Sequence, residues 1–307
     1  MKPSALKLRL PAKINLCLKV GPRRPDGFHD IDTLMLTVSL FDILTVRSAR
    51  ELHLVCEPTS LSSGPDNLVW KAAELLQKTC GYRYGAYMHL RKEIPWGAGL
   101  GGGSSDAAGA LLGLNRLWGL NLPKSELRSL AARLGSDVPF FLEGGLARCT
   151  GRGEKVNVLP ADPVKNLWFV IWNPGIILPT PAVYRSLDEL RTLEKIRAYA
   201  NLTDIESDVN IIVRDIFRGK PERWRGESSN DLEPAALHIC EGLRRWFEVL
   251  SPELREKLHM SGSGSSLFAA ADSRKEAENI RGIAMKLFPN APGRIVAPYV
   301  STWSEIN

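Results

Sequence analysis

The chain has 307 residues, 44% hydrophobic and 24% charged, a composition that predicts a globular protein with a sizeable core and about two domains. Its net charge of +6, from 40 basic and 34 acidic residues, fits an anionic ligand but fits a mixed, solvated surface equally well. No segment approaches 18 uninterrupted apolar residues and the five cysteines are scattered singly, which excludes a transmembrane helix, a disulfide framework and a zinc site, so we expect a reduced, cytoplasmic protein without a membrane partner.

The first half of the chain is predicted to be rich in strands. Short apolar or alternating segments, punctuated by Gly and Pro, predict strands at residues 5–10, 15–20, 33–40, 43–47, 51–56 and 88–94. Helical spacing of apolar residues predicts helices at residues 68–79 (closed by Gly81), 104–118 and 124–134 (closed by Gly135).

The chain turns polar and proline-containing at residues 155–165, and a new apolar strand is predicted at residues 167–172. We place a domain boundary there, which gives an N-terminal domain of residues 1–160 and a C-terminal domain of residues 161–307. Residues 185–229 are charged and weakly patterned, and they predict no function. A further apolar strand at residues 267–271 follows a second glycine-containing turn.

A glycine-rich segment precedes the helix predicted at residues 104–118. It places five glycines in the seven positions 97–103, followed by Ser104 and Ser105. Glycine loses the most conformational freedom on folding, so such a run indicates a ligand that must approach the main chain closely. Free N–H groups and the helix dipole attract anions at a helix N-terminus, and serine hydroxyls add donors. The segment therefore predicts a phosphate site.

Two other nucleotide-binding motifs fit the glycine-rich segment less well. Residues 97–102 fit the G-x-G-x-x-G pattern of dinucleotide-binding folds, but the preceding strand carries Arg91, Lys92 and Glu93, and no acidic residue ends a second apolar strand about 20 residues further on. The chain has no G-x-x-x-x-G-K-[ST] motif, which excludes a Walker P-loop. A glycine turn that only packs tightly remains the structural alternative.

Other motifs accompany the glycine run in a fixed order along nearly the whole chain. They are P-A-K-I-N-L (11–16), D-G-F-H (26–29), D-N-L (66–68), G-S-D-V-P-F-F (135–141), G-G-L-A-R (144–148), G-R-G-E (151–154), N-D-L-E (230–233) and S-G-S-G-S-S (261–266). With P-W-G-A-G-L-G-G-G-S-S-D-A-A (95–108), this set resembles the GHMP kinase superfamily of galactokinase, homoserine kinase and mevalonate kinase, and its form is most similar to the 4-diphosphocytidyl-2-C-methyl-D-erythritol kinase branch. The resemblance implies an α+β, two-domain fold with the active cleft between the N-terminal and C-terminal domains.

The resemblance also implies catalytic and ATP-binding residues. Asp137 would accept the proton of the attacking hydroxyl, and Lys13 would stabilise charge on the transferred phosphoryl group. From the residues alone, Asp137 could instead be a helix cap, and a structural or solvent-facing role is favoured for Lys13. Mg²⁺ should arrive with ATP and touch Ser105, since the sequence predicts no metal site built by the protein alone. The expected ATP-binding residues are Asn67, Leu68, Val69, Pro95, Gly97, Ala98, Gly99, Leu100, Gly101, Gly102, Gly103, Ser104 and Ser105.

For the acceptor, the resemblance implies 4-diphosphocytidyl-2-C-methyl-D-erythritol, phosphorylated on its 2-hydroxyl by ATP in the non-mevalonate isoprenoid pathway. A selective pocket for cytosine needs aromatic faces and directed hydrogen bonds, which Phe28, His29 and Tyr184 supply, and Asn15 and Thr180 complete the expected acceptor site. Family members often carry tyrosine where this chain has Phe28, so any contact by that hydroxyl is lost here. Tyr184 as an ordinary core residue is the structural alternative.

The sequence leaves three other functions open. A mevalonate or homoserine kinase would share the fold, although the D-G-F-H motif and the context of Asp137 argue against both. An ATP-dependent decarboxylase, which phosphorylates its substrate and then releases CO₂, is a related alternative. A nucleic-acid module is the alternative from another class. It is disfavoured because no basic stripe with interleaved aromatics occurs, so we expect a small-molecule substrate and no nucleic-acid partner. The sequence does not indicate an oligomeric state.

Overall fold

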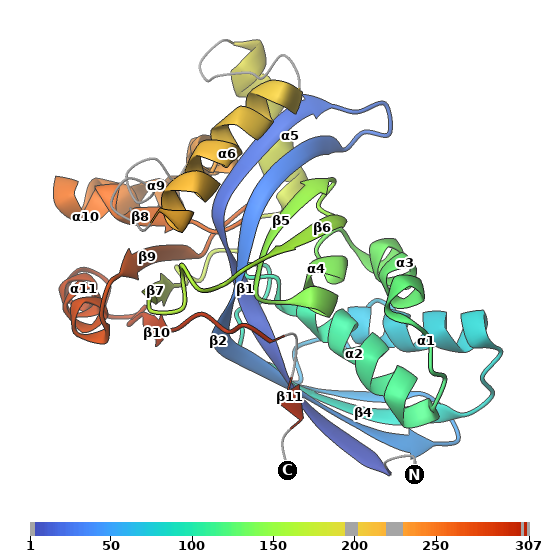
Figure 1. Ribbon diagram of the computed structural model, residues 1–307. Coiled ribbons are helices and arrows are strands. Elements are labelled where there is room, and N and C mark those ends of the chain that lie inside the picture. The colour runs from blue at the N-terminus through green and yellow to red at the C-terminus, as the bar shows by residue number, and fades with distance from the viewer. Residues whose placement is uncertain (1–3, 194–201, 219–229, 302–303, 306–307) are drawn as a thin grey trace.

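The computed structural model in Figure 1 contains two β-sheets with helices packed around them, and it describes residues 4–193, 202–218, 230–301 and 304–305. The seven-stranded sheet comprises β1 (Ala5–Arg23), β2 (His29–Ala49), β3 (His53–Glu57), β4 (Gly85–Arg91), β5 (Leu146–Gly151), β6 (Lys155–Leu159) and β11 (Ser304–Glu305). The four-stranded sheet comprises β7 (Trp168–Trp172), β8 (Leu258–Met260), β9 (Leu267–Ala271) and β10 (Arg294–Val296). The predicted α+β class is confirmed.

Strands β1 and β2 form one long antiparallel hairpin that runs through the middle of the molecule (Figure 1). The sequence predicted two short strands in place of each, which is wrong because β-bulges at Pro11/Ala12 and between Asn15 and Cys17 carry the pairing through the irregular positions. Burial alternates at the start of β1 and becomes continuous from Leu10 onward. The central part of the hairpin is therefore covered on both faces.

Helices of the first half cover one face of the larger sheet. They are α1 (Leu68–Cys80), α2 (Gly102–Trp118), α3 (Lys124–Leu134) and α4 (Val138–Glu143). The three predicted helices are confirmed, and Gly81 ends α1 in the left-handed conformation with φ +61°. Helix α2 begins at Gly102, before its predicted start at residue 104, so the last glycines of the run lie inside the first helical turn.

The helices of the second half pack around the smaller sheet and around the end of the β1–β2 hairpin that carries its turn. They are α5 (Thr180–Thr192), α6 (Leu202–Phe217), α8 (Leu232–Ile239), α9 (Glu241–Glu248), α10 (Pro252–Glu256) and α11 (Arg274–Leu287). Leu18 and Ile31, from the far end of the hairpin, share a core with Val183 of α5 and Leu232 of α8. The segment at residues 185–229, which predicted no function, contains most of α5 and all of α6, and residues 194–201 and 219–229 of it lie outside the described part.

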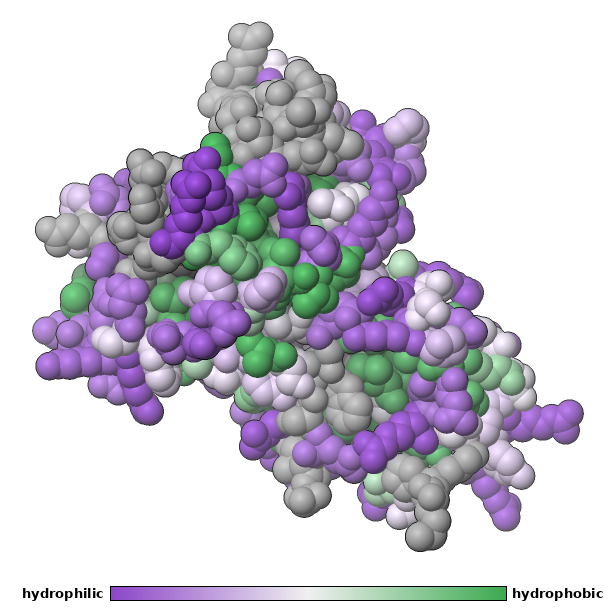
Figure 2. All heavy atoms as spheres, in the orientation of Figure 1, coloured by the Kyte–Doolittle hydropathy of each residue, from purple (hydrophilic) through white to green (hydrophobic). Residues whose placement is uncertain are grey.

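A short strand of the second half pairs with the sheet of the first half. Strand β11 pairs with β1, with Glu305 opposite Leu8, so the C-terminal segment returns to the N-terminal sheet. The division at residue 160 stays a prediction. Figure 2 shows hydrophilic residues around the periphery of one face and apolar residues gathered near its middle. Within the described ranges, no helix is long and apolar enough to cross a membrane.

Candidate active site

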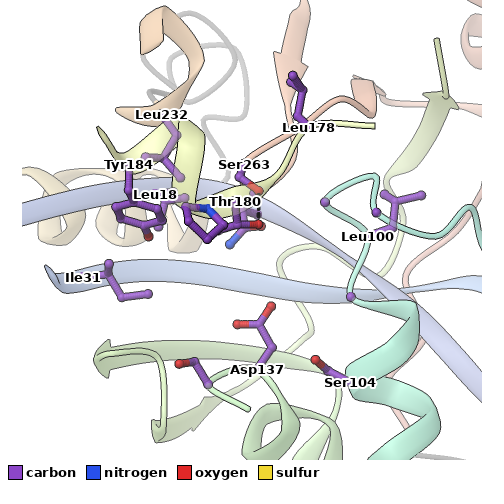
Figure 3. Close-up of a pocket in the computed structure, with 18 of the residues that line it drawn as sticks. Leu18, Ile31, Leu100, Ser104, Asp137, Leu178, Thr180, Tyr184, Leu232 and Ser263 are labelled. Atoms are coloured by element: carbon purple, nitrogen blue, oxygen red, sulfur yellow. Dashed lines mark hydrogen bonds between the residues drawn. The ribbon is translucent and has the colours of Figure 1, made fainter. Parts of the chain in front are cut away.

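A cleft of about 820 Å³ lies between the two halves of the chain and collects most of the predicted site residues. Its lining includes Lys13, Asp137 and all the residues predicted for the acceptor: Asn15, Phe28, His29, Thr180 and Tyr184. From the predicted ATP site it includes Leu68, Pro95 and residues 97–104. In Figure 3, Ser104 and Asp137 lie on one wall, and Thr180, Ser263 and Tyr184 lie on the opposite wall.

Three residues predicted for the ATP site do not line this cleft. Asn67 caps α1, since its Oδ1 accepts from the Val69 backbone N–H at 2.9 Å, and Val69 is buried in the core behind it. Ser105 is buried at the N-terminus of α2, where its Oγ has no hydrogen-bond partner among the described residues. Their assignment to the ATP site stays a prediction.

Lys13 and Asp137 face each other across the floor of the cleft. Lys13 Nζ lies 3.8 Å from Asp137 Oδ2, and the two side chains are 4% and 30% exposed, so the carboxylate is the one open to a ligand. Asp137 immediately precedes α4, but its side chain makes no capping hydrogen bond. The helix-cap interpretation of Asp137 therefore has no support in the geometry, and its carboxylate is available for chemistry.

The Lys13 side chain contacts both Asn15 and Asp137. Its Nζ donates to Asn15 Oδ1 at 2.5 Å, and Asn15 Nδ2 donates in turn to Thr33 Oγ1 at 2.8 Å. Burial lowers the pKa of Lys13 from its ordinary value, and the nearby Asp137 carboxylate opposes that shift. Lys13 and Asn15 share one face of β1, and the bulge that follows Asn15 turns Leu18 toward the same cleft.

The glycine-rich segment is fixed by backbone contacts with both halves of the chain. Leu100 O accepts from the Lys13 backbone N–H at 2.9 Å, and Ala98 O accepts from the Ser266 N–H at 3.1 Å. Ser261 Oγ donates to Gly99 O at 3.0 Å. The second glycine turn, at residues 261–266, thus lies directly against the first.

Two of the glycines are required by their own surroundings, independently of any ligand. Gly99 has φ +77°, and a Cβ there would lie 2.0 Å from Ser261 O. Gly101 has φ +70°, and a Cβ would lie 2.8 Å from the Phe141 ring. By contrast, a Cβ on Gly103 would meet only Leu68 Cδ1 at an ordinary 3.5 Å. The tight-packing interpretation therefore holds for part of the run, and Gly103 is the position that packing leaves unexplained.

Buried charges anchor the first turn of α2. Lys92 Nζ bonds to Asp42 and to Asp106, with Asp106 Oδ2 at 2.5 Å, and all three side chains are almost fully buried. Asp42 Oδ1 also accepts from the backbone N–H groups of Glu93 (2.6 Å) and Ile94 (2.9 Å). Burial raises the pKa of Asp106 to about 8, although Lys92 opposes the shift. This cluster joins β2, the segment before the glycine run and α2 into one unit.

The other end of the cleft is built from side chains. The His29 and Tyr184 rings stack with centroids 5.2 Å apart, and His29 Nε2 lies 2.8 Å from Asp188 Oδ1. Phe28 is half exposed, and the Arg152 guanidinium lies 4.9 Å from the centre of its ring. Burial raises the pKa of the Tyr184 phenol, so this ring stays neutral.

Several lining residues were missed by sequence reasoning. Trp96, 47% exposed, follows Pro95 in the glycine-rich segment, and a large aromatic in such a loop was the signal that could have found it. Arg23, Arg152 and Arg185 also line the cleft, so its basic residues outnumber Asp137 and Asp188. These arginines come from segments far apart in the chain, and no local pattern brings them together.

The N-D-L-E motif, to which the sequence assigned no role, connects the parts of the site. Asn230 Nδ2 donates to Met260 O at 2.8 Å and to Gly262 O at 2.7 Å, which fixes the second glycine turn. Asp231 Oδ2 accepts from the Val20 backbone N–H at 2.9 Å, and Asp231 lies within ion-pair distance of Lys19 and Arg191. The motif therefore ties β1 to the second half beside the cleft.

The chain is similar to several known proteins. Residues 67–145 match the model of the GHMP kinases N terminal domain. The chain is 36% identical to the 4-diphosphocytidyl-2-C-methyl-D-erythritol kinase of Synechococcus sp. (strain CC9311), over 94% of each protein. A crystal structure of 4-(cytidine 5'-diphospho)-2C-methyl-D-erythritol kinase matches with a TM-score of 0.72 and 33% identity, covering 95% of this chain and 98% of that one. A crystal structure of homoserine kinase from Cytophaga hutchinsonii ATCC 33406 matches with a TM-score of 0.76 and 19% identity, covering 99% of this chain and 98% of that one. At this identity the match shows only that the two proteins share a fold.

Proposed function

The chain belongs to the 4-diphosphocytidyl-2-C-methyl-D-erythritol kinase family of GHMP kinases, and from that premise we propose how its cleft works. The enzyme transfers the γ-phosphoryl group of ATP to the 2-hydroxyl of 4-diphosphocytidyl-2-C-methyl-D-erythritol, giving the 2-phosphate and ADP in the non-mevalonate isoprenoid pathway. One observation carries the assignment of the residues. The Lys13–Asp137 pair lies between a glycine-rich helix N-terminus and a stacked histidine–tyrosine pair.

Asp137 is the proton acceptor in this proposal. Its carboxylate faces the cleft, makes no capping bond, and is within reach of a hydroxyl placed between the two walls. As the hydroxyl oxygen attacks the γ-phosphorus, its proton passes to Asp137, and the bond from phosphorus to the β,γ-bridging oxygen breaks, leaving ADP. Positioning and electrostatics supply most of the rate enhancement in such transfers.

Lys13 and the helix N-terminus handle the phosphate charge. Asn15 and Asp137 fix the Lys13 ammonium, so it requires little reorganisation as negative charge shifts toward the transferred group. The first turn of α2 is capped by no side chain, since Gly101 occupies the cap position. Its N–H groups at Gly102, Gly103 and Ser104 are therefore oriented to bind the ATP phosphates.

Mg²⁺ fits this site as a companion of ATP. In the described part of the chain, no group of three or more His, Cys, Asp or Glu side chains could hold a metal ion alone. Mg²⁺ binds nucleotide phosphates, waters and only one or two protein oxygens, and the Ser104 hydroxyl lines the cleft as such a donor. When bound, the ion would neutralise charge on the β- and γ-phosphates.

The acceptor occupies the other end of the cleft. Phe28 and Tyr184 offer aromatic surface to the cytosine ring, and His29 offers a polar edge. Arg23, Arg152 and Arg185 give this end a positive charge that suits a diphosphate. The 2-hydroxyl would then point toward Asp137.

The acceptor is tested by measuring ADP release with a panel of alcohols. The panel contains 4-diphosphocytidyl-2-C-methyl-D-erythritol, 2-C-methyl-D-erythritol 4-phosphate, mevalonate and homoserine. We expect turnover with the cytidyl compound and little with the other three, because they lack the base and the diphosphate. Turnover confined to mevalonate or homoserine would contradict the proposed acceptor and leave the fold assignment intact.

A further inference from the structure

Helix α5 contacts His29 at two points. Thr180, Tyr184 and Asp188 recur at intervals of four residues, so they lie on one side of this helix. Tyr184 stacks on the His29 ring, while Asp188 Oδ1 lies 2.8 Å from its Nε2 atom. The histidine side chain is 4% exposed and that of Asp188 is 36% exposed. A histidine from the first half is thus held by its face and by its edge from the second half.

The partner of Nε2 determines the hydrogen-bonding character of the other ring nitrogen. A carboxylate only accepts hydrogen bonds, so the contact with Asp188 places a proton on Nε2. In a neutral imidazole the remaining nitrogen, Nδ1, is then an acceptor. His29 lines the cleft, and Nδ1 is the ring nitrogen that Asp188 does not contact.

This arrangement distinguishes two pyrimidines of nearly the same shape. Cytosine carries an amino group, a donor, at the position where uracil carries a carbonyl oxygen, an acceptor. We propose that Asp188 is a positioning residue that makes the cleft select cytidine over uridine acceptors by fixing the proton on Nε2 of His29. The inference rests on the proposed function, and it adds a specificity-determining residue beyond the groups that contact the base.

A merely structural role for Asp188 would have a different signature. If the His29–Asp188 contact only held α5 against β2, its loss would loosen the pocket and weaken every pyrimidine nucleotide alike. If Asp188 sets the position of the proton on His29, its replacement by asparagine instead allows the pocket to bind uridine ligands as well as cytidine ligands. An amide both donates and accepts, so either neutral form of His29 is tolerated, and Nδ1–H can donate to the uracil oxygen.

The test is calorimetric titration with cytidine 5′-diphosphate and uridine 5′-diphosphate while a non-hydrolysable ATP analogue saturates the ATP site. Wild-type protein should bind the cytidine ligand roughly 5- to 150-fold more tightly, the range expected for one mismatched buried polar contact. In Asp188→Asn the uridine ligand should bind more tightly than in wild type, and the ratio should fall toward one. The matched control is Glu189→Gln, which removes the same charge from the adjacent, exposed position of α5 and should leave the ratio unchanged.

Two outcomes would overturn the inference: an unchanged ratio in Asp188→Asn, or equal weakening of both ligands. Melting temperatures of the three proteins identify any variant that fails to fold, in which case Asp188→Glu, which keeps the carboxylate, must retain the wild-type preference. Failure of the proposed function can be distinguished from failure of this inference, because wild-type protein would then release no ADP with the cytidyl acceptor. Turnover of that acceptor with an unaltered ratio in Asp188→Asn rejects the role of Asp188 alone.

Discussion

The two ends of the cleft are built in different ways. The phosphate end consists of backbone, with Gly99 and Gly101 at positive φ packed against Ser261 and Phe141. The acceptor end consists of side chains, in which His29 of the first half meets Tyr184 and Asp188 of the second half. In the proposed mechanism the backbone end binds the ATP phosphates, whereas the side-chain end selects the acceptor.

Because of this difference, substitutions at the two ends have different effects on packing and on ligand binding. Changes at most glycines of the phosphate end disturb packing and ligand together, because the same atoms serve both. Changes at the acceptor end remove a ring or a polar group while leaving the backbone in place. Substitutions at the phosphate end should therefore raise the KM for ATP, and substitutions at the acceptor end should raise the KM for the acceptor.

The largest effect is expected between the two ends, at the proton acceptor. Asp137→Asn keeps the shape of the side chain but cannot take a proton, so kcat should fall by roughly 10²- to 10⁴-fold while the KM for ATP changes little. Asp162→Asn, at an exposed carboxylate paired with Lys165, is the control and should retain full activity. Activity of Asp137→Asn within a few-fold of wild type would mean that the carboxylate only orients Lys13.

The phosphate end has a local signal in the sequence, whereas the contacts within the acceptor end have none, for a physical reason. Glycine runs and the residues flanking them are local, because the strand, the turn and the helix that hold phosphate follow one another in the chain. The contact of His29 with Asp188 joins positions 159 residues apart, and nothing in either local pattern indicates it. Likewise, the bulge after Asn15 that aims Leu18 at the cleft depends on pairing with β2.

The next largest effect tests the side-chain end. Tyr184→Ala removes an aromatic face worth about 1–3 kcal/mol of base stacking, so the KM for the acceptor should rise roughly 5- to 150-fold. The KM for ATP should stay near its wild-type value, since Tyr184 lies away from the glycine run. An acceptor without its cytidine is the control substrate. If Tyr184→Ala weakens that truncated acceptor as much as the full one, Tyr184 acts as a core residue.

A smaller effect separates packing from ligand binding within the glycine run. Gly103→Ala adds a methyl group that the protein itself accommodates, so its melting temperature should match that of wild type, while the KM for ATP should rise roughly tenfold if phosphate approaches there. Gly99→Ala should instead lower the melting temperature, because a left-handed conformation costs about 1–2 kcal/mol for alanine and its Cβ overlaps Ser261. An unchanged KM for ATP in Gly103→Ala would make the whole run a packing turn.

The elements of the fold could be predicted where their patterns are regular. Helix α3 has the predicted bounds, as does β9, since each carries an uninterrupted apolar period between clear stop signals. Strands β1 and β2 were divided wrongly because tertiary contacts on both faces sustain pairing through Pro11 and the bulges. The return of β11 to β1 left no local signal, because two residues of edge strand have no period of their own.

The smallest effect concerns the buried charges under the phosphate end and appears as a pH dependence of stability. Burial raises the pKa of Asp106 to about 8, above the value of about 4 expected in the unfolded chain. The folded state therefore binds the extra proton between these values, and stability is lost as pH rises through that window, by at most about 1.4 kcal/mol per pH unit. Asp106→Asn keeps a neutral side chain of similar size, so it should gain several degrees in melting temperature relative to wild type between pH 6 and pH 9.

Glu233, whose pKa burial raises to about 7, titrates in the same range but in both proteins, so the difference between the two melting curves isolates Asp106. A constant difference across this range would mean that Lys92 keeps Asp106 ionised, and the first turn of α2 would then rest on a fully charged cluster.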